Sequence, residues 1–197
     1  MKPDVHAING STVIRSLYFD NLTDEALKDK INGVGKREKF RIRYYNDDLS
    51  FIRLEKKSKI NNLCVKHSSV LTYEEAFSII KGDIGFLKNS RDSLRTEFYS
   101  KLKSGGLKPK AVVEYRREPY TFPVSNVRVT IDYDIRTGMK PSEFLNPSGV
   151  TIPVPDNPVI LEVKWDNFLP DIIREAVALK NRRSGAFSKY AASRSYN

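Results

Sequence analysis

Four segments alternate between apolar and charged residues, and this alternation constrains the fold more than any other feature of the sequence. In residues 38–46, Phe40 and Ile42 fall on one face and Arg41 and Arg43 on the other. The same period of two recurs in residues 50–58, 125–134 and 158–165. Successive side chains of a β-strand point to opposite faces. Each segment is therefore predicted to be a strand with one apolar and one charged face.

Further strands and helices follow from shorter patterns. Three more strands are predicted at residues 11–19, 63–71 and 110–119. Turn-forming Asn and Asp residues separate 38–46, 50–58 and 63–71, which predicts an antiparallel meander. Helices are predicted from Thr23 to Lys30, from a Thr72–Glu75 capping box to Lys81, from Ser90 or Asp92 to Gly105, and from Pro170 to about Arg182.

These elements predict an α+β fold: an antiparallel β-barrel tunnel with the helices packed outside. The helices carry apolar residues that need a surface to cover, and the apolar strand faces provide one. The charged faces would then turn inward around a tunnel. A doubly wound fold is disfavoured because helices and strands do not alternate regularly. Neither a G-x-G-x-x-G motif nor a P-loop is present.

Composition limits the partner and the compartment. The 197 residues fit a single domain spanning 1–197, and no apolar run approaches the roughly 20 residues of a membrane span. A single cysteine and a polar N-terminus favour a cytoplasmic protein. Two histidines and one cysteine are too few for a common zinc site, so any metal should be a hard cation. The net charge of +10 indicates an anionic partner.

The charged strand faces indicate what that anion is. They concentrate Arg and Lys rather than Ser, Thr or Asn, and like charges on neighbouring strands repel unless an anion lies between them. Arginine binds phosphate oxygens with two parallel hydrogen bonds, and lysine adds a point charge. Glu55 and Glu162 are isolated among these cations. They either balance charge or coordinate Mg²⁺ or Mn²⁺, and Glu162 is the stronger metal candidate.

Seven segments carry a resemblance to a known family. They are RSLYFDN (15–21), KFRIRYYN (39–46), LEKKSK (54–59), VVEYRREPY (112–120), RVTIDYD (128–134), ILEVKWDNFLP (160–170) and FSKY (187–190). Together they resemble the vacuolar transporter chaperone (VTC) domain, most closely its bacterial members. That family belongs to the triphosphate tunnel metalloenzymes, also called the CYTH superfamily. The resemblance implies a closed eight-stranded tunnel lined with basic residues, and metal-dependent polyphosphate synthesis from ATP.

The resemblance also implies roles for individual residues. By position it assigns phosphate binding to Arg41, Arg43 and Arg128, metal binding to Glu162, and further basic positions to Lys57, Arg117, Lys164 and Lys189. The alternation independently selects these residues except Arg117 and Lys189, and it adds Arg53 and Glu55. We therefore expect Lys57, Arg117 and Lys189 to be catalytic, Arg41, Arg43, Arg53, Arg128 and Lys164 to bind phosphate, and Glu162 and Glu55 to hold Mn²⁺ or Mg²⁺.

One departure from the family affects these expectations. Family members usually begin with a Glu-x-Lys strand, and this chain opens after the position of that strand. Relative to the family we therefore expect a tunnel domain without its first strand. An unpaired sheet edge favours association with a second chain, which would give a homo-oligomer.

Three alternatives to a polyphosphate polymerase remain. The first is a hydrolase of the same superfamily that acts on a triphosphate. The second is a non-catalytic module that binds polyphosphate or a nucleotide. The third is a nucleic-acid module, for which aromatic residues among the cations would stack bases. Nucleic acid is not the expected partner, because acids on the same faces would repel a phosphate backbone.

Overall fold

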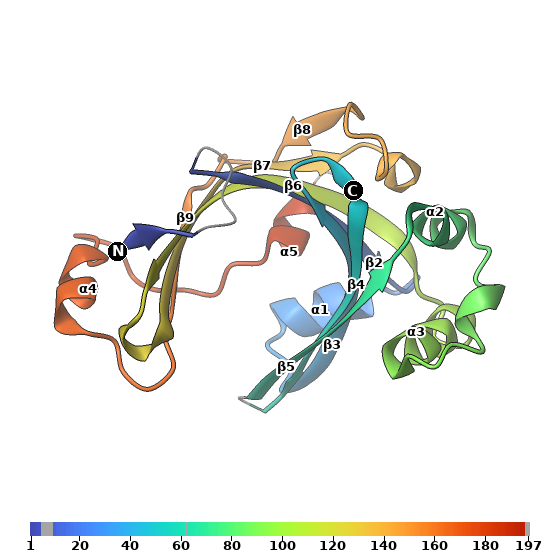
Figure 1. Cartoon of the computed structure of the whole chain (residues 1–197), viewed down its shortest axis with the longest axis horizontal. Helices are drawn as coiled ribbons and strands as arrows, with labels where there is room; N and C mark the ends of the chain where they lie inside the picture. The colour runs from blue at the N-terminus through green and yellow to red at the C-terminus, as the bar shows by residue number, and fades with distance from the viewer. Residues whose placement is uncertain (5–9, 62, 196–197) are drawn as a thin grey trace.

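All seven predicted strands form in the computed structural model, which describes residues 1–4, 10–61 and 63–195 (Figure 1). Two short strands, first and eighth in chain order, join them. The strands are β1 (Lys2–Pro3), β2 (Thr12–Asp20), β3 (Lys36–Tyr45), β4 (Asp48–Ile60), β5 (Leu63–Leu71), β6 (Lys108–Phe122), β7 (Val127–Gly138), β8 (Thr151–Pro153) and β9 (Ile160–Lys164). They form one antiparallel sheet in the order β5-β4-β3-β2-β6-β7-β8, with β1 on β6 and β9 on β7.

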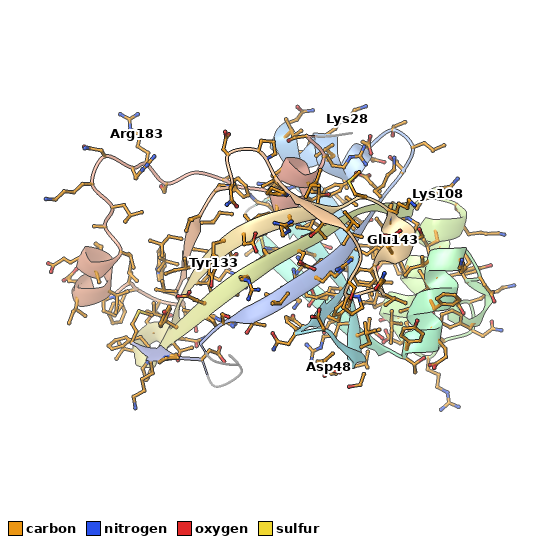
Figure 2. All side chains as sticks on the ribbon, turned by 90° about the horizontal axis from the view of Figure 1, so that it is seen from above. Lys28, Asp48, Lys108, Tyr133, Glu143 and Arg183 are labelled. Atoms are coloured by element: carbon orange, nitrogen blue, oxygen red, sulfur yellow. The ribbon has the colours of Figure 1, made fainter. Side chains whose placement is uncertain are left out.

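The sheet curves into an arch with a convex and a concave side (Figure 1). Its long central strands β2, β6 and β7 run side by side (Figure 2). Within the described residues β5 pairs only with β4, and β8 and β9 pair only with β7. The α+β, antiparallel class is confirmed, but these strands do not close into the expected barrel.

The convex side of β2, β3 and β4 is apolar and is covered by helices. Helix α2 spans Tyr73–Lys81 and helix α3 spans Ser93–Lys103. Ala76 and Ile79 of α2 and Phe98 of α3 are buried in the same cluster as Ile42 and Leu54. The apolar face predicted from period-two alternation is thus the face that the helices cover.

A third helix covers the other arm of the arch. Helix α4 spans Asp171–Ala176, and its Ile173 packs with Val129 of β7 and Val163 of β9. The prediction that this helix runs to about Arg182 is wrong. The helix ends at Ala176 with Val177 as its C-cap, and Asn181 further along has φ 59°, a left-handed conformation that a right-handed helix excludes.

Two helices lie on the concave side, against the expectation that helices pack only outside (Figure 1). Helix α5 (Lys189–Ser193) was not predicted, and its Tyr190 ring stacks on Tyr18 of β2 at 5.0 Å. Helix α1 (Glu25–Ile31) starts without a side-chain bond from its N-cap residue, so the predicted Thr23 cap is wrong. The Asp20 carboxylate accepts hydrogen bonds from the first-turn amides instead and also accepts one from the Tyr190 hydroxyl.

The predicted capping box of α2 is confirmed. The Thr72 hydroxyl accepts a hydrogen bond from the Glu75 amide, and the Glu75 carboxylate accepts one from the Thr72 amide. We expect Thr72→Ala to lower the free energy of unfolding by about 1 kcal/mol, because one first-turn amide loses its partner. Thr72→Ser keeps the hydroxyl, and its free energy of unfolding should lie within a few tenths of a kcal/mol of the wild-type value. Urea denaturation of the three proteins measures both effects, and equal losses in both variants would contradict the capping role.

No helix among the described residues is long and apolar enough to cross a membrane.

Candidate functional site

The strand register brings the predicted cations together on the concave side. Because directly paired residues of antiparallel strands point to the same side, Arg41 and Glu55 share one row and Arg43 and Arg53 share the next. Lys57 lies one row further along, between Lys39 of β3 and Lys66 of β5. The concave side of β3, β4 and β5 is therefore a series of basic rows interrupted by one acid.

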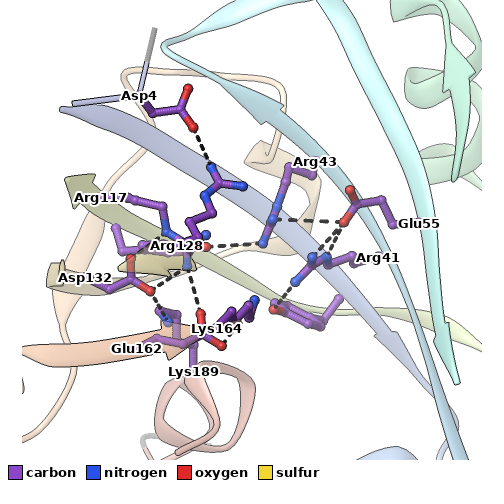
Figure 3. Close-up of polar contacts among 12 residues, drawn as sticks. Asp4, Arg41, Arg43, Glu55, Arg117, Arg128, Asp132, Glu162, Lys164 and Lys189 are labelled. Atoms are coloured by element: carbon purple, nitrogen blue, oxygen red, sulfur yellow. Dashed lines mark hydrogen bonds and ion pairs between the residues drawn. The ribbon is translucent and has the colours of Figure 1, made fainter. Parts of the chain in front are cut away.

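That acid, Glu55, is buried and contacts three cations, of which Figure 3 labels Arg41 and Arg43. One of its oxygens lies 2.8 Å from Arg41 Nε and 4.0 Å from Arg43 Nη1, and the other lies 2.6 Å from Lys66 Nζ. Burial raises the pKa of Glu55, but Arg41, Arg43 and Lys66 outweigh it and lower the pKa to about 2. Its oxygens are occupied by cations. The surroundings therefore favour a charge-balancing role over the metal-binding role expected for Glu55.

A second buried acid organises the other arm of the arch (Figure 3). Asp132 of β7 is 0% exposed, and its two oxygens accept hydrogen bonds from Arg117 Nε at 2.6 Å and Nη2 at 2.7 Å. Lys189 Nζ of α5 lies 2.6 Å from the same carboxylate. Burial raises the pKa of Asp132, but Arg117 and Lys189 outweigh it and lower the pKa.

Tyr115 of β6 lies between the two acidic centres. Its hydroxyl accepts a hydrogen bond from Arg43 Nη2 at 3.4 Å. The Lys189 ammonium lies 4.6 Å from the centre of its ring, and the Arg117 guanidinium lies 5.5 Å from it. The Glu55 and Asp132 clusters are therefore parts of one concave surface.

Several cations of this surface have no acidic partner. Among the described residues, no carboxylate lies within ion-pairing distance of Arg53, Lys57 or Lys39. A cavity of about 20 Å³ is lined by Lys57 and Lys39 together with Arg41, Glu55 and Lys66. Desolvation lowers the pKa of Lys39, and the neighbouring Arg41 and Lys57 add to that effect. The surface therefore carries more positive charge than its own acids balance.

A larger cavity of about 550 Å³ lies at the end of β3, between α1 and α3. Lys39 is the residue that lines both cavities. The other walls of the larger cavity carry both acidic residues, such as Asp29 and Glu38, and basic residues, such as Lys59 and Lys101. The Glu55 and Asp132 clusters, with their concentrated cations, are therefore the better candidate site.

The last predicted site residues come from β7 and β9. The Arg128 guanidinium lies 3.2 Å from the Asp4 carboxylate. Glu162 is 41% exposed at its side chain, with one oxygen 3.3 Å from Lys164 Nζ and the other 3.7 Å from Arg117 Nη2. Of the three acids, Glu162 is thus the one with oxygens open to a further ligand.

The residues fit a metal that is shared with a substrate. No group of three or more His, Cys, Asp and Glu side chains forms a metal cage in the part of the chain that the structure describes. Mg²⁺ commonly uses one or two carboxylates and completes its coordination with substrate phosphates and water. Glu162, half-exposed beside Lys164 and Arg117 of the concave surface, matches that donor set.

Sequence reasoning missed Asp132, Tyr115 and Lys39 as site residues. Alternation placed Asp132 on the charged face of its strand, but only its contacts distinguish it from Asp134. Asp134 has φ 48°, and its carboxylate lies near Arg116 and Arg136 instead. The pairing of β6 and β7 shifts register at this point, so the strict period of two is broken.

The cations also act on Tyr18, whose hydroxyl accepts a hydrogen bond from Arg41 Nη1 at 3.0 Å. Burial raises the pKa of Tyr18, but Arg41, Lys39 and Arg43 outweigh it and lower the pKa to about 7. The folded pKa thus lies below the unfolded value of about 10. Ionisation of Tyr18 should therefore increase stability as pH rises from about 7 to about 10.

We expect one of the ten tyrosines to ionise near pH 7. A titration followed by tyrosinate absorbance should show this step in the wild type and not in Tyr18→Phe. Added tripolyphosphate should move the step to higher pH, because it neutralises the cations that lower the pKa. A wild-type titration with no ionisation below about pH 9 would contradict the prediction.

Comparison with known proteins identifies a family and finds similarity to solved structures. No curated protein matches the chain. A solved structure from Bacillus halodurans, described as a "putative adenylate cyclase", matches with a TM-score of 0.45 and 13% identity. The match covers 74% of this chain and 64% of the solved chain, so this chain spans less than two thirds of the length of the solved one. The model of the VTC domain family matches residues 1–196. The chain belongs to the VTC domain family.

Proposed function

We propose that this protein is a metal-dependent phosphoryl transferase that builds polyphosphate from ATP on its concave surface. The observation that carries the proposal is the gathering of cations from three strands and α5 around two buried acids. Arg41 and Arg43 come from β3, Lys57 from β4, Arg117 from β6, and Lys189 from α5. Such a surface matches a chain of phosphates, because each phosphate presents oxygens that arginine and lysine bind.

Each group has a role in this reaction. Arg41, Arg43 and Arg53 would hold the phosphates of one reactant along β3 and β4, and Arg128 and Lys164 would hold those near β9. Arg117, Lys189 and Lys57 would face the transferred phosphoryl group. Charge neutralisation and positioning supply most of the catalysis of phosphoryl transfer, so no covalent nucleophile is needed. The arch would form part of the wall of a phosphate tunnel.

Glu162 would hold Mn²⁺ or Mg²⁺ together with the substrate phosphates. The metal supplies charge neutralisation and polarises the phosphoryl group when bound. Lys164 and Arg117 flank the carboxylate and would keep it oriented toward the concave surface.

Product analysis tests the proposal. The purified protein is incubated with ATP and Mn²⁺ or Mg²⁺, and the products are separated by length on a gel. We expect metal-dependent polymer longer than the substrate, and its loss in Arg41→Ala. Orthophosphate as the sole product would show that the protein is a triphosphatase and not a polymerase. Binding of tripolyphosphate without turnover would show that the protein is a non-catalytic module that binds polyphosphate or a nucleotide.

A further inference from the structure

Asp132 is a buried acid of the concave surface and links two of the cations that the proposed reaction uses, Arg117 and Lys189. It is 0% exposed, and it joins three elements: β7, which carries it, β6 through Arg117, and α5 through Lys189. The side chains of Arg117 and Lys189 are 17% and 16% exposed, so both cations still reach the concave surface.

The contacts of Asp132 leave part of each cation available. Its carboxylate takes the edge of Arg117 formed by Nε and Nη2. Among the described residues, Nη1 of Arg117 has no hydrogen-bond partner. One carboxylate and two cations also leave one net positive charge. Without the carboxylate, Arg117 and Lys189 would repel each other and would lose the geometry that they now share.

We propose that Asp132 is a positioning residue that holds Arg117 and Lys189 in place for the phosphoryl group; the proposal rests on the proposed function. Asp132 contacts no substrate. It fixes the directions of two groups that do, and it couples α5 to the sheet at that point.

Two other roles are less consistent with the structure. A metal-ligand role requires open oxygens, and both oxygens of Asp132 accept hydrogen bonds from cations. A purely structural ion pair exists on the opposite face of the same sheet. There Glu114 lies 2.9 Å from the buried Arg15, on the side of the sheet away from the concave cations. Glu114→Gln is therefore a matched control for loss of a carboxylate beside a buried arginine.

The test compares Asp132→Asn with Glu114→Gln. We expect Asp132→Asn to lower kcat by about 100-fold, because misplacement of catalytic groups by about 1 Å costs that much. Binding of tripolyphosphate without metal should be unchanged or tighter, because the site has lost a negative charge. The metal concentration for half-maximal rate should also be unchanged. Glu114→Gln should keep both kcat and binding, whatever its loss of stability.

A second readout does not depend on turnover. Reductive methylation of lysines, resolved by mass spectrometry, should modify Lys189 faster in Asp132→Asn than in the wild type. Lys164, whose side chain is 60% exposed and which contacts Glu162, serves as the internal control and should react equally in both. If the wild type turns over no triphosphate, the proposed function fails, and the labelling and binding measurements still decide the role of Asp132.

Three results would overturn the proposal. An unchanged kcat together with an unchanged rate of Lys189 methylation in Asp132→Asn would show that Asp132 does not position Arg117 and Lys189. A higher metal requirement would make Asp132 a metal ligand. If Asp132→Asn does not fold, Asp132→Glu takes its place, since it keeps the charge but moves the carboxylate, and kcat should still fall. Unfolding of both, with Glu114→Gln folded, would leave Asp132 only a structural role.

Discussion

Glu162→Gln is expected to lower metal-dependent turnover by about 1,000-fold, or about 4 kcal/mol in the reaction barrier. The substitution keeps the shape of the side chain and removes the charge that would hold the metal. Lys164 and Arg117 also lose their contacts with the carboxylate. Binding of tripolyphosphate in the absence of metal should therefore be at least as tight as in the wild type.

Steady-state rates over a series of Mn²⁺ concentrations, together with Mn²⁺ binding measured by water-proton relaxation, test this prediction. Glu175→Gln is a suitable control, because it removes an exposed carboxylate near Arg174 on α4. It should keep the wild-type rate and metal requirement. If Glu162→Gln retains both as well, Glu162 is not the metal ligand.

Glu55→Gln is expected to lower the free energy of unfolding by about 3–5 kcal/mol at neutral pH, because removal of one partner leaves a buried charge unbalanced. Arg43 is 6% exposed and lies 4.0 Å from the Glu55 carboxylate, so its charge would lose its nearest acid. The pKa of Glu55 is lowered from 4.5 to about 2 in the folded protein. The stabilisation is therefore complete above about pH 5 and is lost as pH falls through 2.

Thermal or urea unfolding across that pH range tests this prediction. The difference in free energy of unfolding between the wild type and Glu55→Gln should be constant above about pH 5 and should decrease toward pH 2. Tripolyphosphate should stabilise Glu55→Gln more than the wild type, because the anion replaces the missing carboxylate. Glu114→Gln should show no such selective gain. Equal stabilisation of all three proteins by tripolyphosphate would count against the role of Glu55.

The sequence predicted those parts of the fold that depend on local pattern. Alternation placed Ile42 and Leu54 under helices and Arg41 and Arg43 on the opposite side, because in each strand one face is strongly apolar. The Thr72–Glu75 box predicted the start of α2 because both partners lie within one helical turn. Residues 63–71 were predicted as a strand and form β5 with those bounds.

The remaining features depend on contacts between distant parts of the chain. Asp132 differs from Asp134 only through a register shift between β6 and β7. Helix α5 is five residues long and is held by Tyr190 against Tyr18 and Asp20, which no local pattern could indicate. The same holds for Lys189, which only the family resemblance selected. Closure of the sheet was expected from that resemblance, and the described strands do not pair in that way.

The central position of β2 in the sheet also governs when the site can form during synthesis. β2 pairs with β6, and Arg15 of β2 meets Glu114 of β6 across 99 positions of sequence. At about 5–20 residues per second, a ribosome needs roughly 5–20 s to make that stretch. Asp20 meets Tyr190 across 170 positions. The nascent chain must therefore keep β2 unpaired on one edge for seconds, and stopped-flow refolding should show the slow, nonlocal step that such pairing requires.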